Sequence, residues 1–490
     1  MVKQHLIFSI FVVPTFPLIM KQQKQLGLWL LVFVSLGSMI GSGIFNSPKD
    51  LIHVANPMGT LATWIFGGIG ALMLALVFIY LSAKKPELKS GIYAYARDGF
   101  GDYMGFNSAW GYWSLGWLGN ISYLVLFFKT LNDLLGEHAL SPLTCFILGS
   151  AILWFYYFIL LSGIREGAIL NFVVTIAKLM PIALVILLGF SLVDNEVFNV
   201  PDWQTKLASS GKSTTPLLQV KDAMAVVLWC FVGIEAASVL SGRAKSQQVV
   251  RRAIIISVLS VLGIYMLVTF VAMASIPAKE LAASDTPLSL VLGKTTIGAA
   301  GSLIVQAGIM ISVLGASLSW ILLSVETMYA AAREGVMPKI LAKVNKKQTP
   351  VNALLLTQLF TQLFLLSILS PALNETYLAA ITIGTTMVLI PYLLSSLYAV
   401  KVSFGGRHEK SIYKLIAILG TLYAVYVIYA VGIKYLFLSI IFYAIGAFVF
   451  LKGRQEQKQK PKQWEWAFIL ILIAAAITLT VLILTGKIVI

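Results

Sequence analysis

Long, uninterrupted apolar stretches separated by short polar connections dominate this chain. Of its 490 residues, 59% are hydrophobic and only 11% are charged, whereas a soluble domain is normally about 45–50% apolar and about 25% charged. The stretches do not alternate apolar with polar residues, so they indicate membrane-spanning helices rather than the strands of a β-barrel. The sequence therefore predicts an all-α polytopic membrane protein.

At about 20 apolar residues per span, the chain is predicted to contain twelve core transmembrane helices and a thirteenth, C-terminal span. The predicted ranges are 26–48, 56–82, 103–128, 142–162, 168–192, 218–241, 252–275, 299–328, 351–370, 375–400, 412–431, 433–451 and 464–486. A basic linker, KGRQEQKQKPK, precedes the last span. Residues 1–19 are either a signal-like segment or an extension upstream of a start at Met20, and the polar MKQQKQ that follows favours the second interpretation.

Basic residues gather in the loops that follow even-numbered helices. They are Lys84, Lys85, Lys89, Arg97, Arg243, Lys245, Arg251, Arg252, Lys339, Lys343, Lys346, Lys347, Lys401, Arg407 and Lys410. The positive-inside rule then places the N-terminus in the cytoplasm. The chain is predicted to lie in the cell (cytoplasmic) membrane. This distribution also accounts for the net charge of +16, so no nucleic-acid partner is expected.

The cysteines and histidines of the sequence do not indicate a cofactor site, a metal site or an enzyme active site. Cys145 and Cys230 both fall inside apolar blocks and are interpreted as small buried hydrophobes. The four histidines lie near block ends or in loops, so no pair is placed to hold haem or a catalytic metal. The alternative functional class for this protein is a membrane-embedded enzyme or a sensor. It would need a nucleophile, base or metal constellation within the membrane, or a sizeable soluble domain, and neither is evident.

Two predicted helices carry residues that weaken helices at the depth where a helix is most needed. The first contains GSMIGSGIF, residues 37–45, and the sixth contains CFVGIEAAS, residues 230–238. Glycine costs a helix interior about 1 kcal/mol relative to alanine. Interrupted spans at matching positions of two halves indicate an inverted-repeat secondary transporter. The predicted repeats are residues 20–192 (helices 1–5) and 193–402 (helices 6–10), and residues 403–490 hold the additional helices and the basic linker.

Unwound backbone within a membrane is tolerated only where it lines a protein or water cavity. Freed amides at a half-helix N-terminus attract an anion, and freed carbonyls accept from a cation. Two facing breaks can therefore hold the carboxylate and the ammonium that all α-amino acids share. The alternative is that the glycines only permit close packing between helices.

Three motifs carry a resemblance to a known family: GSMIGSGIFNSP, KPELKSGIYAYARDGFGDYMGFNSAWGYW and LWCFVGIEAAS. Together they resemble the amino acid–polyamine–organocation superfamily and, within it, the basic amino acid/polyamine antiporters, most closely the arginine/ornithine antiporters. The resemblance covers the chain from Gly27 to about residue 450. It implies the LeuT-type 5+5 fold, substrate exchange and a homodimer. By similarity, the substrate carboxylate meets the amides of Ser42 and Gly43, and its ammonium meets the carbonyls of Met39, Trp229 and Val232.

The same resemblance assigns roles to side chains. In arginine/agmatine antiporters of this family, the residue matching Trp229 stacks on the guanidinium, the one matching Trp320 blocks the cytoplasmic exit, and the one matching Asn120 contacts the far end of the substrate. The implied cytoplasmic gate consists of Tyr112, Glu235 and Tyr392. The alternative is that these tryptophans have a structural role only, as core residues or as anchors at the membrane interface.

The chain departs from those relatives at Ser38, where they have Asn, and at Gly384, where they have Ser. The side-chain end of the pocket therefore differs, and the substrate need not be arginine.

Lys178 and Glu235 are ionisable residues well inside predicted spans, which makes them functional candidates. By resemblance, a lysine at position 178 lies against the break in the first helix and takes the place of a sodium ion. It could carry a coupled proton or simply hold that helix, so proton symport stays open while sodium coupling is disfavoured. The alternative for Lys178 is that its side chain extends to the membrane interface. The alternative for Glu235 is that it only forms hydrogen bonds with the backbone freed at the helix break.

These features together predict a secondary transporter that exchanges a cationic amino acid for a related amino acid or amine by alternating access. Arginine/ornithine exchange is the first choice. Histidine/histamine exchange, lysine/cadaverine exchange and proton-coupled symport are the alternatives on the same scaffold.

Overall fold

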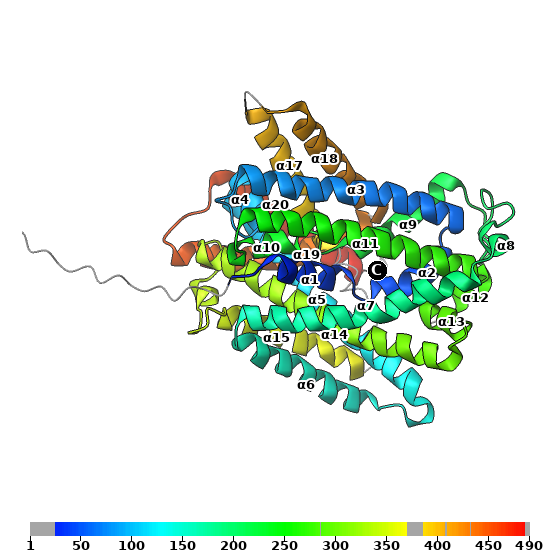
Figure 1. Ribbon diagram of the computed structural model, residues 1–490. Coiled ribbons are helices and arrows are strands. Elements are labelled where there is room, and N and C mark those ends of the chain that lie inside the picture. The colour runs from blue at the N-terminus through cyan, green and yellow to red at the C-terminus, as the bar shows by residue number, and fades with distance from the viewer. Residues whose placement is uncertain (1–24, 285, 370–385, 407–408, 432, 486–490) are drawn as a thin grey trace, which may run out of the picture.

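The computed structural model describes residues 25–284, 286–369, 386–406, 409–431 and 433–485, which form helices joined by short connections (Figure 1). The α-helices are α1 (Leu28–Met39), α2 (Gly43–Ile52), α3 (Pro57–Lys84), α4 (Ile92–Phe100), α5 (Asp102–Leu135), α6 (Pro142–Leu161), α7 (Ile164–Gly189), α8 (Asn195–Phe198), α9 (Pro216–Phe231), α10 (Ala236–Val239), α11 (Gln247–Ser275), α12 (Ala278–Ala283), α13 (Pro287–Gly293), α14 (Gly298–Arg333), α15 (Val351–Leu365), α17 (Leu389–Gly405), α18 (Ser411–Val431), α19 (Ile433–Glu456) and α20 (Gln463–Leu484). Short 3-10 helices include η3 (Leu240–Arg243), η4 (Lys339–Ala342) and η5 (Leu366–Leu369). Residues 1–19, Met20, Gly384 and the first part of the predicted helix 375–400 lie outside the described residues.

Within this described part, ten helical segments are long and apolar enough to cross a membrane. The broken pairs Leu28–Ile52 and Pro216–Arg243 each count as one segment, and α17 is a shorter apolar helix. The prediction of an all-helical polytopic membrane protein is thereby confirmed. The count of twelve core helices plus one, and the inverted repeat, stay predictions.

Several helices extend beyond the apolar blocks from which they were predicted. The block 103–128 became α5, which continues to Leu135, and the block 299–328 became α14, which continues to Arg333. The backbone hydrogen bonds of a helix continue through polar residues until a residue with non-helical geometry ends the helix. Gly136, with a φ of +53°, ends α5 in this way. The short helix α4 was not predicted, because it is too short to resemble a span.

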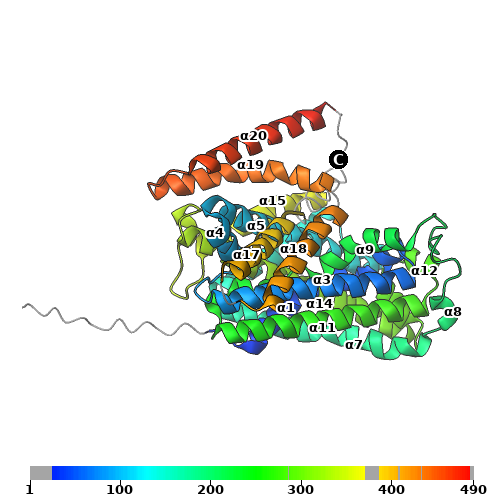
Figure 2. The same cartoon turned by 90° about the horizontal axis from the view of Figure 1, so that it is seen from above.

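The two broken helices lie at the centre of the bundle. The segment α1 contacts α7, α11 and α14, and α9 contacts α2 and α3. Peripheral helices instead expose apolar side chains, such as Leu470 and Ile471 of α20, as expected where lipid surrounds them. Figure 2 shows α19 and α20 side by side along one flank. The core is therefore built around the interruptions.

Helices α5 and α14 pack closely through small residues. A methyl group at Gly116 of α5 would lie 1.6 Å from Ser324 Oγ and 2.9 Å from Ser324 Cβ, whereas a methyl group at Gly119 would meet nothing within 4 Å. Small residues let membrane helices approach each other and gain dispersion contacts. This contact matters for the site because α5 carries Tyr112 and α14 carries Trp320.

Gly116→Ala is expected to lower the melting temperature of the detergent-purified protein relative to Gly119→Ala. Both substitutions bring the same gain in helix propensity, so their difference isolates the overpacking between α5 and α14, which costs about 1–3 kcal/mol. Fluorescence-monitored thermal unfolding of the two variants measures it. Equal melting temperatures would contradict this packing.

Candidate functional site

The first break separates α1 from α2 by three residues. Ile40 leaves helical geometry with φ −84° and ψ 84°, and α2 starts at Gly43. The first amides of any helix have no partner inside it. Those of Ser42 and Gly43 find no hydrogen-bond acceptor among the described residues. The break therefore presents two backbone donors to a ligand.

Side chains from two neighbouring helices satisfy the carbonyls that α1 frees. Lys178 of α7 is fully buried, and its Nζ donates to the carbonyl of Gly37 at 3.0 Å and also to that of Ile40. Ser312 of α14 donates to Ile40 O at 3.3 Å. The lysine thus lies against the break, and its ammonium is held by backbone dipoles of α1.

Tyr265 of α11 was not singled out from the sequence, yet it contacts the same segment. Its hydroxyl donates to the carbonyl of Met39 at 3.1 Å, and the amide of Gly41 donates to that carbonyl at 3.1 Å as well. A carbonyl has two lone pairs, so both acceptor sites of Met39 are used. Only a lone tyrosine in the apolar run VLGIYMLVTF marks this residue in the sequence.

The second break separates α9 from α10 at residues 232–235 and lies against the first. Gly233 adopts φ +114°, and a methyl group there would come within 2.6 Å of Ser38 Oγ. Glycine is therefore required by both its conformation and its close approach to α1. The carbonyl of Val232 accepts no hydrogen bond in the described part of the chain. This break consequently offers a free acceptor.

The predicted gate residues Tyr112 and Tyr392 both form hydrogen bonds with Glu235. Tyr112 of α5 donates to one carboxylate oxygen at 2.7 Å, and Tyr392 of α17 donates to the other at 2.5 Å. All three side chains are buried. No basic side chain among the described residues pairs with Glu235, so the two hydroxyls are its polar partners together with the amide of Gly233 at 3.3 Å. Three elements are joined through one carboxylate.

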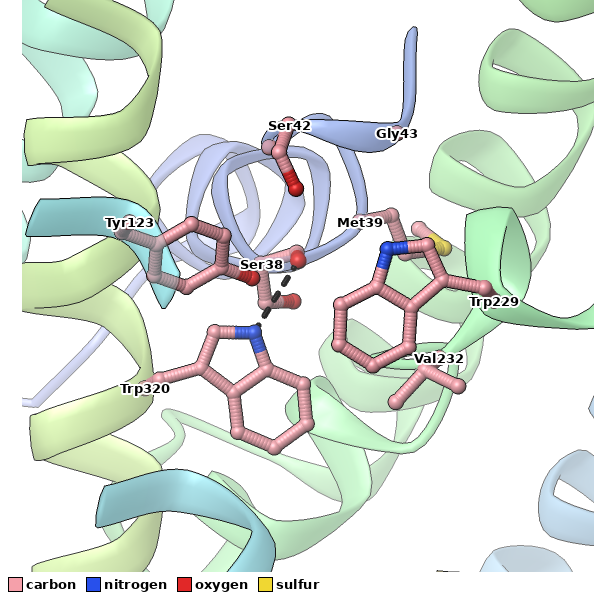
Figure 3. Close-up of a pocket in the computed structure, with 9 residues that line it drawn as sticks. Ser38, Met39, Ser42, Gly43, Tyr123, Trp229, Val232 and Trp320 are labelled. Carbon is pink, nitrogen blue, oxygen red and sulfur yellow. Dashed lines mark hydrogen bonds between the residues drawn. The ribbon is translucent and has the colours of Figure 1, made fainter. Parts of the chain in front are cut away.

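A small cavity lies between the two breaks (Figure 3). Its volume is about 10 Å³, enough for roughly one water molecule. The lining residues are Ser38, Met39, Gly41, Ser42, Gly43, Tyr123, Trp229, Val232 and Trp320. The rings of Trp229 and Trp320 lie on different sides of the cavity, and Trp320 Nε1 donates to the carbonyl of Ser38 at 3.2 Å. An amino acid fits here only if the lining residues move apart.

Two residues of α5 differ from the sequence-based expectation in their placement. Tyr123, which the sequence did not single out, lines the cavity, whereas Asn120 is not among the lining residues. Asn120 donates to the carbonyl of Gly116 at 2.8 Å, while its buried Oδ1 has no partner among the described residues. That oxygen is an unused acceptor one helical turn from Tyr123.

The arrangement combines backbone donors, a backbone acceptor and aromatic rings. These groups can bind a zwitterion with a cationic side chain but supply no nucleophile or base constellation. Among the described residues, no group of three or more His, Cys, Asp or Glu side chains could hold a metal. Cys145 and Cys230 are buried free thiols.

Comparison with known proteins identifies the family of the chain. The family model for amino acid permeases matches residues 26–434. An arginine/ornithine antiporter of Pseudomonas aeruginosa is 38% identical over 453 residues, which cover 89% of this chain and 92% of that protein. A putative arginine/ornithine antiporter of Escherichia coli (strain K12) is 34% identical, covering 88% and 93%, and an arginine/ornithine antiporter of Latilactobacillus sakei is 33% identical, covering 89% and 92%. The chain belongs to the amino acid permease family.

Proposed function

We propose that this protein is an antiporter of the cell membrane that exchanges a cationic amino acid for a related one, with arginine and ornithine as the substrate pair. The proposal rests mainly on the two facing helix breaks. They leave the amides of Ser42 and Gly43 and the carbonyl of Val232 without hydrogen-bond partners among the described residues, close to Trp229. The names of the relatives support the substrate pair. Membership of a permease family makes the chain a transporter, which sets aside the enzyme and sensor alternatives.

In this proposal the substrate's main-chain groups bind to backbone. The carboxylate accepts from the amides of Ser42 and Gly43 at the N-terminus of α2, where the helix dipole also favours an anion. The ammonium donates to the carbonyl of Val232. The carbonyl of Met39 becomes a further acceptor only when Gly41 or Tyr265 releases it, because both donate to it here.

The side-chain end of the substrate would lie against aromatic rings and an amide. A guanidinium or ammonium stacked on Trp229 gains about 0.5–2 kcal/mol, depending on how far it is desolvated. The unpaired Oδ1 of Asn120 is an acceptor for the same cation once the cavity enlarges. Neither group fixes a negative charge, which suits a site that must also release its substrate.

The small cavity supports an occluded state with gates closed. Trp320 is held by Ser38 and lies with its ring centroid 5.6 Å from that of Tyr112. Tyr112 in turn donates to Glu235. We propose that Trp320 and the cluster of Tyr112, Glu235 and Tyr392 open together on the cytoplasmic side, because one chain of contacts joins them.

The wider architecture is proposed to be the LeuT-type inverted repeat, with residues 20–192 and 193–402 as the two halves and 403–490 as additions. Its support is the equivalent position of the two broken helices, α1/α2 and α9/α10. The twelve-plus-one count, a cytoplasmic N-terminus and a homodimer belong to the same proposal.

Labelled arginine should enter proteoliposomes preloaded with ornithine and should not accumulate in empty vesicles. Both substrates carry one positive charge, so a valinomycin-imposed potassium potential should leave the exchange rate unchanged. Measuring uptake with and without preload, potential and pH gradient tests this. Accumulation in empty vesicles under a proton gradient would favour symport and reject antiport. Dependence on the potential would favour exchange for a decarboxylated amine.

Trp229→Leu is expected to reduce arginine/ornithine exchange to near background. Loss of a desolvated cation–π contact of about 2 kcal/mol weakens binding on the order of 30-fold. Trp229→Phe should retain partial exchange. The control is Trp29→Leu, an equal change at a tryptophan that is 60% exposed in α1. Exchange by Trp229→Leu at the wild-type level would remove this residue from the site.

Lys178→Gln is expected to raise the KM for arginine and for ornithine by the same factor, about tenfold or more. Removing the ammonium leaves the carbonyls of Gly37 and Ile40 without their charged donor, and a hydrogen bond to a charged group is worth about 1.5–3 kcal/mol. The damage falls on the α1 break, which both substrates share. Steady-state exchange kinetics, with Lys279→Gln as the exposed-lysine control, measure the two constants. A change confined to one substrate would contradict this role.

A further inference from the structure

The connection between α19 and α20 carries a concentration of lysines. Lys452 lies in the last turns of α19, and Lys458, Lys460 and Lys462 follow before α20 begins at Gln463. All four side chains are exposed. Figure 2 shows α19 and α20 forming a hairpin along one flank, with this connection at its end. We call these four residues, with Lys339, the lysine surface.

Lys339 joins the surface because the α14–η4 connection packs on the end of α19. The Lys339 amide donates to Glu456 Oε2 at 2.7 Å. A methyl group at Gly453 would lie 2.8 Å from the Met337 backbone, and one at Gly335 would lie 3.0 Å from Gln457. The two segments are therefore in close contact, and the lysines of both face the same end of the molecule.

The lysine surface has no ion-pair partner in the part of the chain that the structure describes. None of its five lysines forms an ion pair with another described residue. The nearby acids contact backbone amides rather than the lysine ammonium groups: Glu456 accepts from the Lys339 amide, and the buried Glu465 accepts from the amides of Lys462 and Tyr103. The five ammonium groups are thus exposed and without an ion-pair partner among the described residues, so an external anion can contact them.

The C-terminal end of α19 is also tied to neighbouring helices by ion pairs. Arg454 pairs with Asp102 at 2.7 Å, Asp102 pairs with Arg97 at 2.8 Å, and Arg97 pairs with Glu334. This chain of alternating charges ties α19 to α5 and to the residue after α14. A lysine surface mounted on a fixed turn loses less conformational entropy on binding than one on a mobile tail.

The depth of the surface indicates what kind of anion reaches it. Trp464 and Trp466, 41% and 42% exposed, lie in the first turn of the strongly apolar α20. Tryptophans at the start of an apolar span sit at the level of lipid headgroups. Phe468, one turn further along, is 41% exposed and would face acyl chains. The lysines are therefore placed beside phosphate groups of the bilayer.

From these observations we propose that the lysine surface binds the headgroup of an anionic phospholipid, with Trp464 and Trp466 packing against its glycerol and upper acyl region. Clusters of basic residues next to a span attract anionic lipids, and each contributes about fivefold to binding near the surface. This proposal does not depend on the transported substrate.

Native mass spectrometry of the full-length detergent-purified protein, titrated with phosphatidylglycerol or phosphatidylcholine, tests it. The test variant is Lys458→Gln/Lys460→Gln/Lys462→Gln. The control is Lys206→Gln/Lys212→Gln/Lys279→Gln, which removes the same charge from exposed lysines around α8 and α12 at the other end of the bundle (Figure 1). Equal melting temperatures and retained exchange verify that each variant is folded.

The wild type should retain phosphatidylglycerol over phosphatidylcholine. The test variant should lose about tenfold or more of its affinity for phosphatidylglycerol, after allowance for ionic screening. The control should stay within about twofold of the wild type, and an arginine triple variant at 458, 460 and 462 should bind as the wild type does. Equal retention by the test variant and the wild type would overturn the proposal. Equal losses in test and control variants would also overturn it, since bulk charge alone would then explain binding.

Discussion

A helix that unwinds inside a membrane must find polar partners for every backbone group it frees, because no water is present to replace them. This constraint organises the structure around the end of α1. Six surrounding side chains among the described residues donate to carbonyls in and after the last turns of that helix: Asn171 and Thr175 to Phe33, Lys178 to Gly37 and Ile40, Trp320 to Ser38, Tyr265 to Met39, and Ser312 to Ile40 and Gly41. The donors come from α7, α11 and α14, which are the helices that enclose α1.

What remains unpaired is as informative as what is paired. Carbonyls near the break are largely satisfied, whereas the amides of Ser42 and Gly43 are not. Protein donors therefore hold α1 in place, and the α2 amides are the donors to which we propose that an anionic ligand binds. Lys178 donates to two carbonyls of this segment and is not among the residues that line the cavity. In the proposed binding mode, the break between α1 and α2 binds the substrate carboxylate, whereas the end of α9 contributes both the Val232 carbonyl for the ammonium and Trp229 for the side chain.

The break between α9 and α10 connects the cavity to the cluster of Tyr112, Glu235 and Tyr392. Gly233 brings α9 against Ser38, and Glu235, two residues later, is held by Tyr112 and Tyr392. A displacement of α10 would alter both the cavity wall at Val232 and the hydroxyl–carboxylate contacts. Because packed interfaces tend to adopt discrete arrangements rather than deform continuously, such a linkage suits the switching that alternating access requires.

The sequence by itself determined where the helices lie and where two of them break, since apolar length and glycine-serine composition act locally. GSMIGSGIF and CFVGIEAAS were interpretable for that reason, and the resemblance pointed to Trp229, Lys178 and Glu235. Tertiary structure alone decided which polar residues of long helices meet the breaks. The positions of Tyr265 and Tyr123 at the site could not be predicted from the sequence, because the rotation and tilt of a helix depend on its neighbours. The same packing left Asn120 outside the cavity lining and joined distant lysines into one surface.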